Sequence, residues 1–308
     1  MSRLAIVFIL SDDRRMKILV TGAEGLLGKE IVAMKRDGFE VVGTDHSELD
    51  VTDLASIKKA FLKEQPEVVV NCAVILNVDL CQENPNLCFG VNRDGVSNIL
   101  EVIKELGKPV IFFQISSSEV FGRVKEGEYQ INGYTEADAP LPVSNYQKSK
   151  TEAEKIVTDF ARQNPEILPR FYILRAAWLY GKGRRTFVEN FLADLQQPKE
   201  LSVIADQWRS PTWAKHFVDQ LFLLLEKNYP NGTYHGVAEV LSGEATTPQV
   251  IEEISKFLGP NKVKAIIKKV KRDDFFKVPR APSNVLKNTK LPKLPYWRET
   301  LREFLHYL

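Results

Sequence analysis

The sequence predicts an α/β protein built on a doubly wound parallel sheet, with a smaller α/β lobe toward the C-terminus. Through the first half, short apolar segments alternate with amphipathic helical patterns. Strands that are apolar on both faces and separated by helices belong to parallel sheets that helices cover on both sides. A glycine-rich turn after the first apolar segment and an acid at the end of the second indicate that this sheet is Rossmann-like.

The expected elements follow one another in a regular order. Strands are expected at 17–22, 39–45, 67–73 and 109–117, and helices at 26–36, 54–65 and 85–106. After a further strand from residue 170, we expect helices at 187–195, 214–226 and 248–258, a strand at 232–237 and a last helix from 297. The looser spacing of these later elements predicts a second, less regular lobe.

Charge and cysteine usage exclude several classes of protein. The 308 residues carry 42 Lys and Arg against 40 Asp and Glu, so the net charge of +2 gives no broad attraction for nucleic acid or an anionic membrane. Cys72, Cys81 and Cys88 show no CxxC spacing and the four histidines are scattered, so neither a zinc site nor a disulfide framework is indicated. We therefore expect reduced thiols in a cytoplasmic protein.

Residues 1–15 precede the first expected strand and form an N-terminal extension. Their apolar part, residues 4–10, is too short to span a bilayer and has no clear small-residue cleavage site after it. The extension is expected to be either an added segment or the result of a start assigned too early.

A glycine turn joins the first strand to the first helix. Gly22, Gly25 and Gly28 form a GxxGxxG pattern that encloses Leu26 and Leu27. Backbone N–H groups in such a turn can approach a pyrophosphate closely, and the N-terminus of the helix adds partial positive charge. The sequence therefore predicts that these five residues bind a dinucleotide cofactor.

Asp45 ends the second strand and is the expected partner of the adenosine ribose. An acid at this position accepts hydrogen bonds from the ribose and repels a 2′-phosphate, which favours NAD(H). His46 and Ser47 could still accommodate that phosphate, so NADP(H) stays open. We accordingly expect an NAD(P)-binding Rossmann domain at 16–175 and a substrate-binding lobe at 176–308.

Tyr146 stands four residues before Lys150 in a polar stretch, so on a helix the phenol and the ammonium share one face. A Tyr-xxx-Lys pattern alone is expected by chance, and a half-buried tyrosine beside a solvated lysine is the alternative. Three serines, Ser116 to Ser118, end the preceding strand, where a nicotinamide would lie. A carbonyl reduction needs a proton donor and a group that polarises the oxygen, and Tyr146 with Lys150, and Ser117, can supply them.

These residues together resemble the extended short-chain dehydrogenase/reductase family, in which a Ser/Thr, Tyr and Lys triad carries out this chemistry. Within the family the chain is most similar to the dTDP-4-dehydrorhamnose reductases, from Met16 almost to its end. Segments outside the glycine turn support this, among them "NVDLCQENP", "YTEADAPLPVSNYQKSK", "AAWLYG" and "DQWRSPTW". The resemblance implies NAD(P)H-dependent reduction of the 4-keto group of a deoxysugar nucleotide, with Tyr146 as proton donor.

The resemblance also implies roles at matching positions. Asp50 and Val51 would lie against the adenine, and Ala73 and Val74 beside the cofactor, which Tyr146 and Lys150 also contact. The implied sugar contacts are Val78, Ser117, Ser118, Tyr146 and Trp178. For Trp178, which would pack on the sugar, core packing is the alternative, and Arg280 matches an arginine with either a structural or a substrate role.

The chain departs from the family pattern near the expected pocket. Ile75 and Leu76 stand where a polar aromatic residue or His, followed by Thr, is usual, and Ala176 and Ala177 replace Thr-Ser. Gln147 replaces a glycine after the tyrosine. The triad is intact, so we expect a less polar pocket, which leaves the identity of the sugar open, rather than loss of activity.

Two other functions stay open at this point. An NAD-dependent sugar-nucleotide epimerase or dehydratase shares the fold and the triad, although dehydratases need an Asp-Glu pair where this chain has Ser118-Glu119. A non-catalytic NADP-binding subunit, similar to the regulatory β subunit of methionine adenosyltransferase, is the other. The family also implies a homodimer, in some members with Mg²⁺ at the interface, but no acidic cluster in the sequence indicates that ion or another metal.

Overall fold

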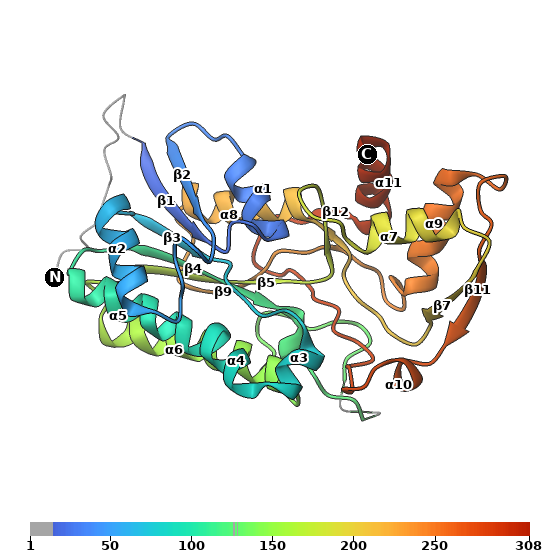
Figure 1. Ribbon diagram of the computed structural model, residues 1–308, viewed down its shortest axis with the longest axis horizontal. Coiled ribbons are helices and arrows are strands. Elements are labelled where there is room, and N and C mark those ends of the chain that lie inside the picture. Colours follow the sequence, from blue (N-terminus) through green and yellow to red (C-terminus); the bar gives the residue numbers. More distant parts are fainter. Residues whose placement is uncertain (1–14, 126, 128) are drawn as a thin grey trace.

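A computed structural model describes residues 15–125, 127 and 129–308 (Figure 1). The expected N-terminal extension lies outside the described residues except for Arg15. The strands are β1 Met16–Thr21, β2 Phe39–Thr44, β3 Val68–Asn71, β4 Ile111–Ser117, β5 Arg170–Ala176, β6 Leu179–Tyr180, β7 Glu200–Ile204, β8 Thr212–Trp213, β9 Gly232–His235, β10 Ala238–Glu239, β11 Ile266–Val270 and β12 Leu294–Tyr296.

The helices follow the expected periodic segments closely. They are α1 Leu26–Ala33, α2 Leu54–Glu64, α3 Val78–Glu83, α4 Pro85–Phe89, α5 Gly95–Leu106, α6 Asn145–Gln163, α7 Phe187–Leu195, α8 Ala214–Glu226, α9 Thr247–Leu258, α10 Arg272–Phe275 and α11 Trp297–Tyr307. The expected helix at 85–106 is α4 and α5 joined by a π-helical turn at Gly90–Asp94. The six-residue α3 was not predicted, because a helix this short shows no clear periodicity.

The main sheet has six parallel strands in the order β2-β1-β3-β4-β5-β9. This confirms the predicted doubly wound, Rossmann-like sheet. The chain runs from β1 to β2 on one side and then returns to β3 on the other, so the strand order reverses between β1 and β3. Ligands of such sheets bind at that reversal, beyond the carboxyl ends of the strands.

Alternate residues of each strand face opposite layers of helices, as a strand's period of two requires. Val20, Val70 and Leu174 pack with α1 and α8, whereas Leu19, Val69 and Ile173 pack with α2, α5 and α6. Figure 1 shows the two helical layers on either side of the sheet. Burial on both faces explains why the strands read as continuous apolar runs.

The second lobe lies beyond the carboxyl end of the sheet (Figure 1). Its core joins α7, α9 and α11 to the parallel pair β7 and β11, around the fully buried Trp297. The chain crosses between the two parts, because α8 and β9 follow residue 176 in sequence yet belong to the main sheet and its core. The functional division of the chain near residue 175 stays a prediction.

A buried ion pair links α6 to the sheet. Arg175 of β5 donates from Nε to Glu154 Oε1 at 2.9 Å and from Nη2 to Oε2 at 2.7 Å, and the two side chains are 3% and 8% exposed. Ser116 Oγ donates to the same carboxylate at 2.5 Å. A buried charge is tolerated only when it is paired and hydrogen-bonded, and Glu154 meets both conditions.

His235 of β9 extends this network. Its Nε2 lies 3.3 Å from Arg175 Nη1, and its Nδ1 lies 2.9 Å from the carbonyl oxygen of Lys287. Burial lowers the pKa of His235 to about 4, so the ring is neutral at neutral pH. A neutral ring satisfies both contacts when Nδ1 carries the proton and donates to Lys287 while Nε2 accepts from Arg175.

Removing the cation of this pair should destabilise the fold. Arg175→Met leaves Glu154 in the interior without its partner, which is expected to lower the free energy of unfolding by about 3–5 kcal/mol in urea denaturation. Arg162→Met is the matched control, because it breaks an exposed ion pair with Asp159 on α6, the helix that carries Glu154. It should lower the free energy of unfolding by at most about 1 kcal/mol. Equal losses for the two variants would contradict the importance of the buried pair.

Candidate active site

The glycine turn after β1 needs glycine at two of its positions. Gly22 has φ +63°, and a Cβ atom there would lie 2.9 Å from the backbone nitrogen of Ala73, so the turn approaches the end of β3 closely. A Cβ at Gly28 would lie 2.5 Å from the carbonyl oxygen of Gly22, so the first turn of α1 packs on the loop. The cap residue Gly25 offers no side chain to the N–H groups of α1. A phosphate therefore fits there.

Two adjoining pockets lie over this turn. The inner one, of about 270 Å³, reaches from Gly22 to the ends of β4 and β5, and the outer one, of about 440 Å³, reaches from Gly22 to the end of β2. They share Gly22, Gly25, Cys72, Val74 and Leu76. The pockets thus form one groove along the carboxyl ends of the strands.

Asp45 marks the outer end of the groove. Its Oδ1 accepts hydrogen bonds from Ser47 N at 2.7 Å, from Ser47 Oγ at 2.6 Å and from Glu48 N at 3.1 Å. These bonds, the Ser47 hydroxyl foremost, lower the pKa of Asp45, so the carboxylate is ionised at neutral pH. His46 and Asp50 line the same pocket, whereas Ser47 contacts Asp45 without lining it.

A buried polar ladder fixes the strand ends at the middle of the groove. Thr21 Oγ1 donates to Asn71 Oδ1 at 2.6 Å, and Asn71 Nδ2 donates to Gln114 Oε1 at 3.0 Å. The three side chains come from β1, β3 and β4. Ala73 N donates to the same Asn71 oxygen at 3.3 Å, so the ladder also holds the loop that follows β3.

Asn92, in the π-helical turn, holds the loop that follows β3 through hydrogen bonds to Ile75. Its Oδ1 accepts from Ile75 N at 2.7 Å, and its Nδ2 donates to Ile75 O at 3.1 Å and to Ser149 Oγ at 3.1 Å. The side chain is 1% exposed. Asn92 therefore ties the pocket loop to α6, and π-helical turns of this kind are frequent at functional sites.

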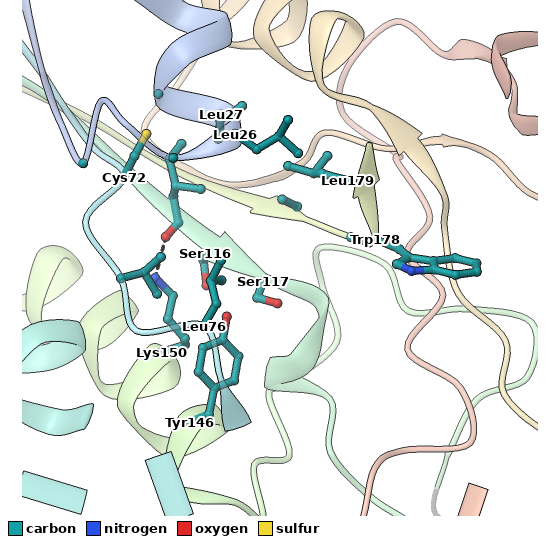
Figure 2. A pocket seen from close by; sticks show the side chains of 17 residues that line it. Leu26, Leu27, Cys72, Leu76, Ser116, Ser117, Tyr146, Lys150, Trp178 and Leu179 are labelled. Carbon is teal, nitrogen blue, oxygen red and sulfur yellow. Dashed lines mark hydrogen bonds between the residues drawn. The ribbon is translucent and has the colours of Figure 1, made fainter. Parts of the chain in front are cut away.

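Tyr146 and Ser117 meet at the inner end of the groove (Figure 2). Tyr146 is 3% exposed, and burial raises the pKa of its phenol, with nearby Glu119 acting in the same direction. A hydrogen bond with the Ser117 side chain partly offsets this shift. The phenol thus keeps its proton at neutral pH and can act as a donor.

Lys150 lies one helical turn from Tyr146, and both side chains line the inner pocket (Figure 2). Its Nζ donates to the carbonyl oxygen of Ile115 at 2.6 Å. Burial lowers the pKa of Lys150 to about 8, and the charge of Glu154, four residues on, opposes that shift. The side chain therefore remains largely an ammonium at neutral pH, in the same pocket as the phenol.

A capping box stabilises the N-terminus of α6. Gln147 Oε1 accepts from Ser144 N at 3.0 Å, while Ser144 Oγ accepts from Gln147 N at 3.4 Å. Gln147 Nε2 also donates to Glu119 at 3.3 Å, and Asn284 Nδ2 donates to the other oxygen of that carboxylate at 2.6 Å. The glutamine that departs from the family pattern is thus a structural part of the site.

Trp178 lines the inner pocket, but its ring is already in contact with other side chains. The Phe187 ring stacks on it at 4.1 Å, and Arg209 Cζ lies 4.8 Å from its centroid. Both groups therefore occupy part of the indole's π surface. These contacts fit the packing alternative better than a free indole face, and the role of Trp178 stays a prediction.

Most predicted site residues lie around this one groove, and three do not. Those that line it are Gly22, Gly25, Leu26, Leu27, Gly28, Asp45, His46, Asp50, Val51, Ala73, Val74, Ser117, Tyr146, Lys150 and Trp178. Ser47 contacts Asp45, Ser118 is 4% exposed, and Val78 packs behind Tyr146. Ile75, Leu76, Ala176 and Ala177 do line it, so the departures from the family pattern fall on the wall. The functional roles themselves stay predictions.

Sequence reasoning missed several residues that shape the site. Asn92, Glu154 and Arg209 act through contacts with residues distant in sequence, so no local pattern could have indicated them. The Ser144 to Gln147 capping box did carry a recognisable signal.

Arg280 is held by Asp79 at 3.5 Å and by the ring of Phe276 at 4.9 Å, and it lines neither pocket.

The part of the chain that the structure describes lacks both a metal-binding cluster and a membrane-spanning helix. It contains no group of three His, Cys, Asp or Glu side chains placed to hold a metal ion. In the same residues, no helix has both the length and the apolar character needed to cross a bilayer.

Comparison with known proteins identifies the family. The model of the RmlD substrate binding domain matches residues 16–308. The chain belongs to the RmlD substrate-binding domain family. A dTDP-4-dehydrorhamnose reductase of Streptomyces griseus is 31% identical over 257 residues, which cover 81% of this chain and 79% of the relative.

Solved structures agree with this assignment. A dTDP-4-dehydrorhamnose reductase ortholog of Clostridium acetobutylicum is 30% identical, with a TM-score of 0.80 over 95% of this chain and 99% of that one. The Bacillus anthracis dTDP-4-dehydrorhamnose reductase in complex with NADP has a TM-score of 0.83 over 96% of this chain and 100% of that one. At 23% identity, the latter shows the shared fold.

The electrostatic state of Lys150 can be measured directly. In NMR spectra of protein carrying ¹³C-labelled lysine, the Lys150 signal, identified by its loss in Lys150→Arg, should titrate near pH 8 because burial disfavours the ammonium. The remaining lysine signals serve as the internal reference. A midpoint at or above about 10.4, the value of an unperturbed lysine, would contradict the burial effect.

Proposed function

We propose that this protein reduces the 4-keto group of a dTDP-linked deoxysugar with NAD(P)H, as the names of its reductase relatives suggest. The observation that carries the proposal is the grouping of half-buried Ser117 with buried Tyr146 and Lys150 at the inner end of a groove that begins at a glycine turn. We further propose a cytoplasmic homodimer.

The residues of the groove fit a dinucleotide. The close approach at Gly22 and the uncapped start of α1 suit a pyrophosphate, and Asp45, ionised at the outer end, suits the ribose hydroxyls. The charge of Asp45 favours NADH, although a Bacillus anthracis relative of the same fold was solved with NADP. When bound, the cofactor supplies the hydride.

In the proposed reaction, the hydride goes to the carbonyl carbon and the Tyr146 proton goes to the carbonyl oxygen, so that the ketone becomes an alcohol. Ser117 holds the carbonyl oxygen by a hydrogen bond, which stabilises negative charge as it develops. Lys150 stabilises the phenolate that remains on Tyr146, which then recovers a proton from solvent. The apolar wall at Leu76 and Ala177 limits the access of competing water.

The dehydratase alternative is less well supported. Glu119 is held by two amide groups, but the position before it is Ser118, a buried residue outside the pocket, and not an acid. The regulatory-subunit alternative stays open, because the apolar wall departs from the family pattern. It predicts cofactor binding without turnover on any keto sugar, so the same experiment separates it from the reductase.

Tyr146→Phe should abolish most of the activity. We expect kcat for NADH or NADPH oxidation with dTDP-4-dehydrorhamnose to fall by about a hundredfold or more, because the proton donor is lost. Tyr180→Phe is the matched control, since it removes a buried hydroxyl that bonds Thr300 at 3.0 Å, away from the groove.

Turnover that survives in Tyr146→Phe would overturn the assigned proton donor. Absence of turnover in the wild-type protein, with the cofactor still bound, would direct the search to another sugar or to the regulatory alternative. Cofactor that stays tightly bound through purification and is not consumed would favour the epimerase.

A further inference from the structure

We propose that Arg184, in the loop between β6 and α7, binds the diphosphate of the dinucleotide cofactor from the side opposite the glycine turn. This inference rests on the proposed function only in that a nicotinamide dinucleotide occupies the groove. Arg184 lines the outer pocket together with Gly22, Gly25 and Asp45, although it lies more than 130 residues away in sequence from each of them.

The position of the loop is fixed on both sides of Arg184. A Cβ at Gly183, where φ is +100°, would lie 3.1 Å from the Cβ of Lys29, and one at Gly181 would lie 3.6 Å from Leu26 Cδ1. On the other side, Thr186 caps α7, with its N–H donating to Glu189 Oε2 at 2.9 Å. The loop therefore runs along the first turns of α1, beside the glycine turn.

The charged side chains that line the outer pocket favour a ligand that places a negative group near Arg184. Among the described residues that line this pocket, Arg184 carries the one permanent positive charge, whereas Glu24, Asp45 and Asp50 are acids. Glu24 pairs with Lys29 at 2.9 Å. No carboxylate lies within ion-pair distance of the Arg184 guanidinium in the part of the chain that is described, so its charge is available to a ligand.

The loop's position selects the diphosphate over the 2′-phosphate of NADP. Gly181 and Gly183 pack against Leu26 and Lys29 of α1, whose N-terminus faces the expected pyrophosphate. A 2′-phosphate would instead lie at the end of β2 beside Asp45. A guanidinium can donate two hydrogen bonds to one phosphate group, and the diphosphate is common to NADH and NADPH.

The test is a fluorescence titration of NADH and of NADPH, without sugar, into the full-length wild-type protein and three variants. Arg184→Gln should raise the Kd of both cofactors by about tenfold, the effect of losing a charge-assisted hydrogen bond. Arg184→Lys should restore part of the affinity. Arg185→Gln is the matched control, because Arg185 is exposed, adjoins Arg184 and lines neither pocket, and the change should leave both constants unchanged.

Each other outcome would overturn the inference. An unchanged Kd in Arg184→Gln would mean that the arginine does not contact the cofactor, and a loss confined to NADPH would assign it to the 2′-phosphate. An equal loss in Arg185→Gln would reduce the effect to general surface charge. If the wild-type protein binds neither cofactor, the proposed function fails as well, whereas in the other outcomes it stands.

Discussion

The buried pair of Glu154 and Arg175 is the interaction on which the rest of the site depends. It joins α6, which carries Tyr146 and Lys150, to the carboxyl ends of the central strands. Two charges taken out of water are stable only with good geometry and additional hydrogen bonds, and Ser116 and His235 complete the set. The orientation of α6 is consequently fixed by an interaction that tolerates little displacement.

Glu154 of this pair also acts on Lys150 of the proposed catalytic group. Burial alone would drive Lys150 further toward its neutral form, and the carboxylate of Glu154 opposes this. Burial in the inner pocket keeps Tyr146 protonated, and Lys150 in the same pocket stays largely cationic. A reductase needs both states. Stability and proposed chemistry share the same residues here.

Local sequence patterns predicted the parts of the site that local structure builds. Gly22 is required by its backbone conformation and by its approach to Ala73, Asp45 ends a strand, and Tyr146 and Lys150 share one helix face. Glu154 and Asn92 could not be found in this way, since each acts through a partner brought near only by folding. Sequence left a crossing between the lobes open but could not assign it to α8 and β9, because the pairing of distant strands leaves no trace in sequence spacing.

Trp178 illustrates how a motif can be retained while its surroundings change. The backbone at this bulky residue has φ +39°, a conformation that costs about 1–3 kcal/mol unless the surrounding structure compensates. Contacts with Phe187 and Arg209 provide that compensation. Burial lowers the pKa of Arg209 to about 10, so it stays charged at neutral pH. A sugar stacked where Arg209 lies would displace that side chain, with the loss of a cation–π contact worth about 0.5–2 kcal/mol. With Arg209 in place, less of the indole surface is open to a ligand, and the apolar wall at Leu76 and Ala177 makes up more of the accessible pocket. Selection among sugars would then depend on shape at that wall more than on stacking.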